Sequence, residues 1–499
     1  MGTDSMARTG VPGLDDILGG GFSRGNIFLL EGSPGTGKTT LALRFLLRGA
    51  EDGERGLYIT MSETETELRS GAASHGWEIG PGIDVFELTP PESQLNAGQE
   101  QSLLYSSDLE LGETTQLIVE RVESVKPVRI VVDSLSEIRL LAQSSLRYRR
   151  QLLALKHYFV GLGATVLLLD DLTSEVEDKT VHSIVHGVVK LDELAHAYGA
   201  ERRRLRVLKY RGHMFRGGYH DFAIRTGGVA VFPRLVAADF RASFERKRVG
   251  SGLKELDALL GGGVERGSSI LILGPAGTGK STFGLQFIAA AAARGEKSAL
   301  LVFDEELQLL FDRSRALGFD LEGWRDAGLL HIEQVDAAEL SPGEFAHRVR
   351  ELADPGLTTV VIDSLNGYRA AMPDELSLTL HVHELLQYLN RRGVTTFLTL
   401  SQHGLIGDVS APVELTYLAD TVILLRYFEA LGLVRRAVSV IKKRTGRHES
   451  AIREFRIGET GLALGEPLTG FQGVLSGAPT FVGDSAPLLD HQRTVLGQH

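Results

Sequence analysis

The sequence predicts an α/β protein of two tandem domains, each with a mostly parallel sheet that carries helices on both faces. Two observations lead to this prediction. The segment LGGGFSRGNIFLLEGSPGTGKTTLALRFL starting at Leu18 matches LGGGVERGSSILILGPAGTGKSTFGLQFI starting at Leu260, so the chain is duplicated with a constant offset of 242 residues. In each copy, apolar strand-like runs alternate with amphipathic segments, an order typical of parallel strands joined by helical crossovers.

The expected strands are continuously apolar and rich in β-branched residues, which suits central strands covered on both faces. They span residues 27–30, 57–61, 128–132 and 165–169 in the first copy and 269–273, 299–303, 359–362 and 395–400 in the second. We therefore expect domains at residues 1–240 and 241–470. A charged segment, 234–248, links the copies, and a flexible tail at 471–499 is rich in Gly, Ser, Pro and Ala.

Bulk composition excludes several classes of protein. With 43% hydrophobic and 23% charged residues the chain has the composition of a globular protein. It contains no cysteine, no apolar run of the ~20 residues that span a bilayer, and no apolar core near the N-terminus. We expect a cytoplasmic protein without a membrane segment. The net charge of -11 makes nucleic acid an unlikely partner.

Two glycine-rich loops carry the strongest functional signal. Residues 32–39 (GSPGTGKT) and 274–281 (GPAGTGKS) both satisfy G-x-x-x-x-G-K-[ST], in which backbone amides and a helix N-terminus surround phosphate oxygens. The pattern predicts that both copies bind ATP with Mg²⁺. The predicted phosphate contacts are Gly35, Thr36, Gly37, Lys38, Thr39 and Thr40 in the first loop and Gly277, Thr278, Gly279, Lys280, Ser281 and Thr282 in the second.

Acidic residues follow the expected strands that accompany each loop. Asp133 and Asp363 each end an apolar strand and, with Thr39 and Ser281, are predicted to ligate Mg²⁺; capping of the next helix is the alternative. Catalytic candidates lie after the second strand of each copy, where a glutamate could orient or deprotonate the attacking water. They are Glu63, Glu305 and Glu306, and the alternative is a charge at a helix N-terminus.

Basic stretches occur late in both copies, at residues 206–211 (RVLKYR) and 438–444 (VSVIKKR). Alternation of apolar and cationic residues places the charges on one face of a strand. These charges either reach a phosphate on the same or a neighbouring subunit, or protect an edge strand. The residues alone do not decide between the two.

With these parts assembled, the chain resembles the KaiC family of duplicated RecA-like ATPases, over roughly residues 8–470. The match rests on the two loops, the strand-end acids at 62–63 and 305–306, the Asp-Ser-Leu strands, and the segments LKYRG (208–212), DTVILL (420–425) and AIREF (451–455). The resemblance implies hexameric double rings with ATP between subunits. It also implies nucleotide contacts from the adjacent subunit by Lys209, Arg211, Lys442 and Arg444, and peripheral contacts by Ser74 and Arg436.

The chain departs from the clock members of that family at three places. Their Ser-Thr phosphoacceptor pair reads Thr416-Tyr417 here, Ser62 replaces one of two glutamates, and the tail lacks their partner-binding segment. We expect an ATP-hydrolysing switch with signalling or clock protein partners, in which Thr416 is the candidate phosphoacceptor and the second site carries transfer chemistry. The alternatives are a RecA- or DnaB-like DNA motor and a scaffold that does not hydrolyse ATP.

Overall fold

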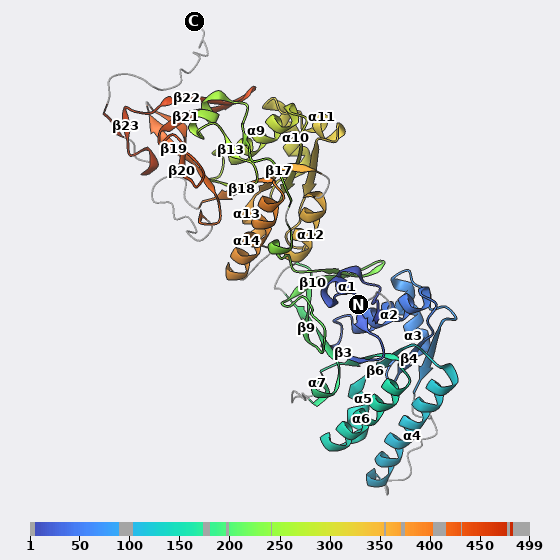
Figure 1. Ribbon diagram of the computed structural model, residues 1–499. Helices are drawn as coiled ribbons and strands as arrows, with labels where there is room; N and C mark the ends of the chain where they lie inside the picture. The colour runs from blue at the N-terminus through green and yellow to red at the C-terminus, as the bar shows by residue number, and fades with distance from the viewer. Residues whose placement is uncertain are drawn as a thin grey trace, which may run out of the picture. The chain divides into compact units, whose positions relative to one another are not determined.

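The computed structural model describes residues 5–88, 103–172, 180–195, 199–240, 242–353, 356–370, 375–402, 416–430, 432–476 and 480–482. The chain divides into two compact units, Met1–Arg234 and Leu235–His499, each of which is considered by itself (Figure 1). Within the described residues, no helix combines the length and apolar character that crossing a membrane requires.

The first unit is organised around a nine-stranded sheet in the order β11-β10-β9-β8-β3-β7-β6-β4-β5. Six strands are parallel, namely β3 (Ile27–Glu31), β4 (Gly56–Thr60), β5 (Ile83–Glu87), β6 (Arg129–Asp133), β7 (Thr165–Asp170) and β8 (Gly187–Leu194). Three antiparallel strands extend the sheet beyond β8, namely β9 (Arg202–Tyr210), β10 (His220–Arg225) and β11 (Gly228–Phe232). The phosphate loop therefore follows a central strand, β3.

The second unit repeats this sheet strand for strand, in the order β16-β15-β17-β18-β14-β19-β20-β21-β22. Its parallel strands are β14 (Ser269–Gly274), β15 (Lys297–Val302), β16 (Leu330–Gln334), β17 (Leu357–Asp363), β18 (Thr395–Ser401) and β19 (Thr421–Ala430). Its antiparallel strands are β20 (Leu433–Lys443), β21 (Ile452–Gly458) and β22 (Gly461–Pro467). The internal duplication thus extends to the complete sheet.

Helices cover both faces of each sheet. Alternate residues of β3 point to opposite faces, so Phe28 and Leu30 pack under one helical layer and Ile27 and Leu29 under the other. In the first unit the layers are α1 (Pro12–Leu18), α2 (Lys38–Glu51) and α3 (Glu65–Ser74) against α4 (Leu103–Val125), α5 (Leu135–Ala142), α6 (Ser145–Gly161) and α7 (Thr180–Ile184). In the second they are α8 (Lys254–Leu259), α9 (Lys280–Ala293), α10 (Leu307–Ala316) and α11 (Leu321–Asp326) against α12 (Pro342–Ala353), α13 (Leu365–Ala370) and α14 (Glu375–Arg391). The predicted fold class is confirmed.

Two segments expected to connect or trail are partly packed. The short helix Ala237–Asp239 lies in the expected linker, yet the Ala237 amide donates to Glu384 Oε2 at 2.9 Å, on α14. In the expected tail, Val474 is buried and Phe471 lies against Phe428. Apolar side chains in both segments pack against the second unit. The composition of the segments did not predict this packing, because charged residues dominate the linker and small or polar residues dominate the tail. Most of the tail, residues 483–499, lies outside the described residues.

A buried arginine joins three parts of the first unit. Arg129 at the start of β6 is fully buried, and its Nε donates to Glu54 Oε2 at 2.5 Å. Its Nη1 donates to the carbonyls of Arg8 at 2.6 Å and Phe45 at 2.8 Å, and its guanidinium stacks over the Phe45 ring. Gly49 on α2 provides the room, because a Cβ there would meet Arg129 Cδ at 2.5 Å.

Replacing Arg129→Ala is expected to lower the free energy of unfolding of the first unit by about 3–5 kcal/mol, because it leaves buried acceptors without their donor. The control Arg48→Ala removes a partly exposed ion pair with Asp52 and is expected to cost at most about 1 kcal/mol. Trp77 and Trp324 are the two tryptophans, one in each unit. Urea unfolding followed by Trp77 fluorescence in a Trp324→Phe background therefore isolates the first unit, and equal losses from both variants would contradict the prediction.

Candidate nucleotide sites

Both glycine loops link a central strand to a helix, the arrangement that their pattern predicts. Gly37 and Gly279 have φ of 95° and 106° and directly precede α2 and α9. A Cβ at either glycine would also meet an isoleucine side chain, Ile224 or Ile457, at 2.5 Å. The positive φ therefore favours glycine at both positions, and the isoleucine would have to shift to admit a larger residue. The first-turn amides of each helix are left pointing into the loop.

The loop lysines are buried and held by the loops themselves. Lys38 Nζ donates to the carbonyls of Gly32 at 2.6 Å and Ser33 at 2.9 Å, and Lys280 Nζ contacts Gly274 and Pro275 in the same way at 3.0 and 2.9 Å. Burial lowers the pKa of Lys280, and the charge of Asp363 opposes that shift. Both ammonium groups thus lie inside their loops, where a phosphate would meet them.

The Thr36 and Thr278 side chains close the loops by donating to Ser33 O and Pro275 O, each at 2.8 Å. The third residues of the two helices differ, because Thr40 lines a cavity whereas Thr282 is buried. These predicted phosphate contacts therefore have unequal surroundings in the two copies.

Oxygen donors suited to Mg²⁺ meet beside the first loop. Thr39 Oγ1 lies 3.4 Å from Asp133 Oδ2, which also accepts a 2.6 Å hydrogen bond from Tyr58. Burial raises the pKa of Asp133, and the Tyr58 hydrogen bond opposes the rise. A hydroxyl and a carboxylate in contact, in a polar and partly desolvated place, fit a hard divalent cation.

The second unit arranges its corresponding pair differently. Asp363 Oδ1 accepts a 2.6 Å hydrogen bond from Thr399, and across the described ranges no hydrogen bond joins Asp363 to Ser281. The donor types still match those of the first unit. Sequence reasoning missed the supporting groups Tyr58 and Thr399, whose positions on neighbouring strands become apparent only in the sheet.

Four predicted residues of the first site share one cavity. Thr39, Thr40, Glu63 and Ser74 line a space of about 370 Å³ beside α2 and α3. The carboxylate of Glu63 is half buried, and burial raises its pKa, with further raising from the charges of Asp133, Glu67 and Asp171. A carboxylate of raised pKa within a cavity next to a phosphate loop has the properties of a general base.

The paired glutamates of the second unit have different partners. Glu306 is the N-cap of α10, accepting from the Leu309 amide at 3.0 Å, while Glu305 forms an ion pair with Arg313. Thr64 is the corresponding N-cap of α3, so the 242-residue offset places Glu305 opposite Glu63 and Asp304 opposite Ser62. Asp304 accepts from Ser364 at 2.5 Å and was missed by sequence reasoning, although the constant offset indicated it.

A further acid that sequence reasoning missed is Asp171. Its Oδ1 lies 2.9 Å from Lys38 Nζ, and it directly follows β7, the strand next to β3. By the register of β7 and β18 against the loop strands, the second unit has Ser401 at the corresponding place. The two loops therefore differ in local charge as well as in their glutamates.

The basic residues lie where the parallel strands begin, at the opposite end of the sheet from their own loops. Lys209 pairs with Val188 in β8, whereas Glu193 Oε2, five residues further along β8, is the group next to Gly35. At about 3.3 Å per residue the separation along the strand is roughly 17 Å. Lys442 repeats this, pairing with Val422 in β19. The basic residues and the loop of the same unit are therefore too far apart to form one nucleotide site.

These basic side chains donate hydrogen bonds to backbone carbonyls in the segments that precede β8 and β19. Lys209 contacts the carbonyl of Val185 at 2.8 Å and Arg211 that of Ser183 at 2.7 Å, while Lys442 contacts Ala419 O at 2.8 Å and Arg444 contacts Tyr417 O. Burial lowers the pKa of Lys209, and the nearby charges of Arg211 and Lys156 lower it further. Such a concentration of cations favours an anion.

The remaining predicted residues follow the same division. Thr416 lies just before β19, where its carbonyl accepts a hydrogen bond from Lys442 Nζ at 2.9 Å. It therefore lies beside the basic pair, at the end of the sheet opposite to the loop. Arg436 instead lies near the loop end of the sheet, because it stacks over Tyr427, whose hydroxyl contacts Ala276 O at 3.4 Å.

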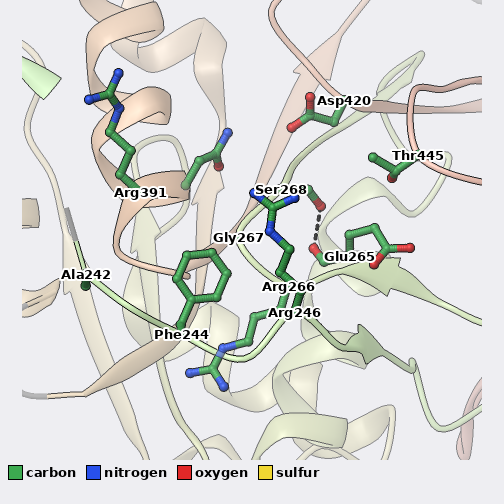
Figure 2. Close-up of a pocket in the computed structure, with 11 residues that line it drawn as sticks. Ala242, Phe244, Arg246, Glu265, Arg266, Gly267, Ser268, Arg391, Asp420 and Thr445 are labelled. Carbon is green, nitrogen blue, oxygen red and sulfur yellow. Dashed lines mark hydrogen bonds between the residues drawn. The ribbon is translucent and has the colours of Figure 1, made fainter. Parts of the chain in front are cut away.

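A separate cavity of about 610 Å³ lies in the second unit at the opposite ends of the parallel strands from the loop (Figure 2). Phe244 stands among its lining residues, with Arg246, Arg266 and Arg391 around it. Ser268 immediately precedes β14 and Asp420 immediately precedes β19, which fixes the location. None of the predicted loop residues lines it, so this cavity is distinct from the candidate nucleotide site.

Together, the matched sheets and loops define a tandem RecA-like protein with a phosphate loop in each unit. A model of the KaiC ATPase family matches residues 7–236 and 249–469. The chain belongs to the KaiC family of ATPases, and membership implies nucleotide binding.

Relatives match over almost the whole chain. Circadian clock protein KaiC3 of Synechocystis sp. is 27% identical over 491 residues, covering 97% of this chain and 96% of that protein. The circadian clock oscillator proteins KaiC of Thermostichus vulcanus and Synechococcus elongatus are each 29% identical, over 488 and 489 residues, covering 95% of this chain and 91% of each relative. The predicted resemblance is confirmed.

Proposed function

We propose that this chain forms a homohexameric double ring that binds and hydrolyses ATP with Mg²⁺ in both units and acts as a cytoplasmic switch on signalling or clock protein partners. The carrying observation is the separation of functional groups. In each unit a loop lysine, a hydroxyl, a strand-end aspartate and a glutamate lie near the end of the parallel strands that carries the loop. The basic pair of the same unit lies at the opposite end of these strands. A basic pair that serves a nucleotide must serve that of another subunit, as in a ring.

In the first unit the loop amides and Lys38 bind the phosphates, and Thr39 with Asp133 holds Mg²⁺, which supplies neutralisation of phosphate charge. Glu63 accepts a proton from water as the water oxygen bonds to the γ-phosphorus and the bond to the ADP oxygen breaks. Lys209 and Arg211 of a neighbouring subunit contact the same phosphates. The second unit uses Lys280, Ser281, Asp363 and Glu305 in these roles.

Thr416 is the proposed phosphoacceptor of a serine/threonine autokinase activity. Support comes from its position beside Lys442, at the end of the parallel strands opposite to the loop of its own unit. The phosphoryl donor is therefore ATP on an adjacent subunit. Tyr417 is half exposed next to it and offers the control hydroxyl.

The test combines assembly and turnover. Purified chain is incubated with ATP and Mg²⁺, its mass is followed by light scattering, released phosphate is measured, and phosphorylated residues are located by mass spectrometry. Hexamers that release phosphate and label Thr416 support the proposal. A chain that remains monomeric, or turnover that needs single-stranded DNA, contradicts the double-ring switch, and label confined to Tyr417 contradicts the assignment of Thr416.

A further inference from the structure

In the second unit, an arginine, Arg313, donates hydrogen bonds to both carboxylate oxygens of Glu305. Arg313 Nε donates to Glu305 Oε1 at 3.0 Å and Arg313 Nη2 to Glu305 Oε2 at 2.6 Å. Glu305 lies in the turn after β15, and Arg313 lies on α10, two helical turns further along. The fork of the guanidinium matches the carboxylate, the strongest geometry for such a pair. The side chains are 29% and 35% exposed, so solvent can compete for both.

The first unit lacks this pair. The amides of Met61 and Phe303 donate to the carbonyls of Asp133 and Asp363, both at 2.8 Å, which fixes the same 242-residue register after β4 and β15. Glu305 then corresponds to Glu63, and Arg313 to Gly71. Gly71 and Glu63 line the same cavity.

The Glu63 carboxylate is correspondingly unengaged, since no hydrogen bond or ion pair holds its oxygens within the part of the chain that the structure describes. The equivalent positions therefore hold a free glutamate in the first unit and an arginine-bound one in the second. The lysines of the two loops contact the same backbone carbonyls, so those contacts do not account for this difference.

A guanidinium on both oxygens opposes the work of a general base. It occupies a lone pair on each oxygen that a water proton would otherwise use, so the carboxylate is poorly placed to take up that proton while the pair is intact. We propose that Arg313 is a positioning residue that latches Glu305, so that hydrolysis in the second unit waits on the breaking of this pair. The inference rests on the proposed hydrolytic function of the second site.

The latch is tested in full-length protein carrying Lys38→Ala, so that only the second site turns over. Arg313→Met keeps the length of the side chain and removes the fork, and is expected to raise kcat about two- to fivefold, the factor that a partly exposed ion pair sustains. KM for ATP is expected to stay unchanged. Arg313→Lys, which keeps charge but not the fork, is expected to give an intermediate kcat.

Arg315→Met is the matched control, because Arg315 lies on the same helix and pairs with Asp312 and Glu322 instead. Its kcat is expected to equal that of the Lys38→Ala parent. A merely structural ion pair at residue 313 would alter stability without raising kcat.

The reciprocal change installs the arginine in the first unit. Gly71→Arg is made with Lys280→Ala, so that only the first site turns over. A Cβ at Gly71 would meet no atom within 4 Å, so a side chain can leave α3 there without a clash at its first atom. We expect kcat to be about two- to fivefold lower than that of Gly71→Met, which places an uncharged side chain of similar length in the same cavity.

A kcat that is unchanged or lowered by Arg313→Met overturns the latch, and so does a kcat of Gly71→Arg equal to that of Gly71→Met. Failure of the underlying function looks different. Protein with only the second site intact would then bind a fluorescent ATP analogue yet release no phosphate with arginine, lysine or methionine at position 313.

Discussion

Glu63→Gln is expected to lower the kcat of the first site by about 10²- to 10³-fold, because a neutral amide cannot accept the proton of the attacking water. The variant is made with Lys280→Ala so that only the first site turns over. Affinity for ATP is expected to be retained, because the loop amides and Lys38 are untouched. Single-turnover phosphate release and equilibrium binding of a fluorescent analogue separate the two effects. Retention of the parent rate would remove Glu63 from the mechanism.

The same glutamate predicts the pH dependence of that site. Burial and the charges of Asp133, Glu67 and Asp171 raise the pKa of Glu63. A base must be ionised, so activity falls as pH decreases through this raised pKa, above the ordinary value of about 4.3. Glu67→Gln removes one repelling charge and preserves a capping residue for α3, so it is expected to move the acid limb to lower pH with little change in the plateau. A limb that stays in place would assign the titration to another group.

The central sheet could be predicted from the sequence because its strands are buried on both faces. The run predicted at residues 165–169 is observed as β7, Thr165–Asp170, and the run at 395–400 as β18, Thr395–Ser401. Edge strands such as β5, with sequence IDVFE, mix apolar and acidic residues and are harder to distinguish from loops. The duplication also relates the two sites residue by residue, since Thr39 and Ser281 are separated by the same 242 residues as Glu63 and Glu305.

Two parts of the site depend on information that local pattern does not hold. Glu305 and Glu306 are equivalent by type, and only the start of α10 makes Glu306 a cap and leaves Glu305 for Arg313. The residues alone did not decide whether the basic stretches bind phosphate or protect a strand, because the proposed phosphate contact involves a second copy of the chain. The fold adds that Lys209 lies roughly 17 Å along β8 from the residue next to its own loop.

Loss of the basic pair in the first unit is therefore expected to affect the neighbouring subunit. Lys209→Ala with Arg211→Ala is expected to lower kcat at the first site by about 10³-fold, the lower range for removal of a cation supplied in trans to a transferring phosphate. Lys280→Ala again silences the second site. The ring itself must persist, which light scattering with ATP checks, because a ring that fails to form would lower the rate for another reason.

Mixed rings distinguish a role in trans from a role in cis. Subunits carrying Glu63→Gln are combined with subunits carrying Lys209→Ala and Arg211→Ala, each inactive alone. Each interface takes a loop and Glu63 from one subunit and a basic pair from the next, so roughly one quarter of the interfaces in a random equimolar ring are intact. We expect about one quarter of the parent rate to return. Mixing Glu63→Gln with Lys38→Ala restores none, because both defects lie on the loop side of every interface, and an equally inactive first mixture would place the basic pair outside the neighbouring site.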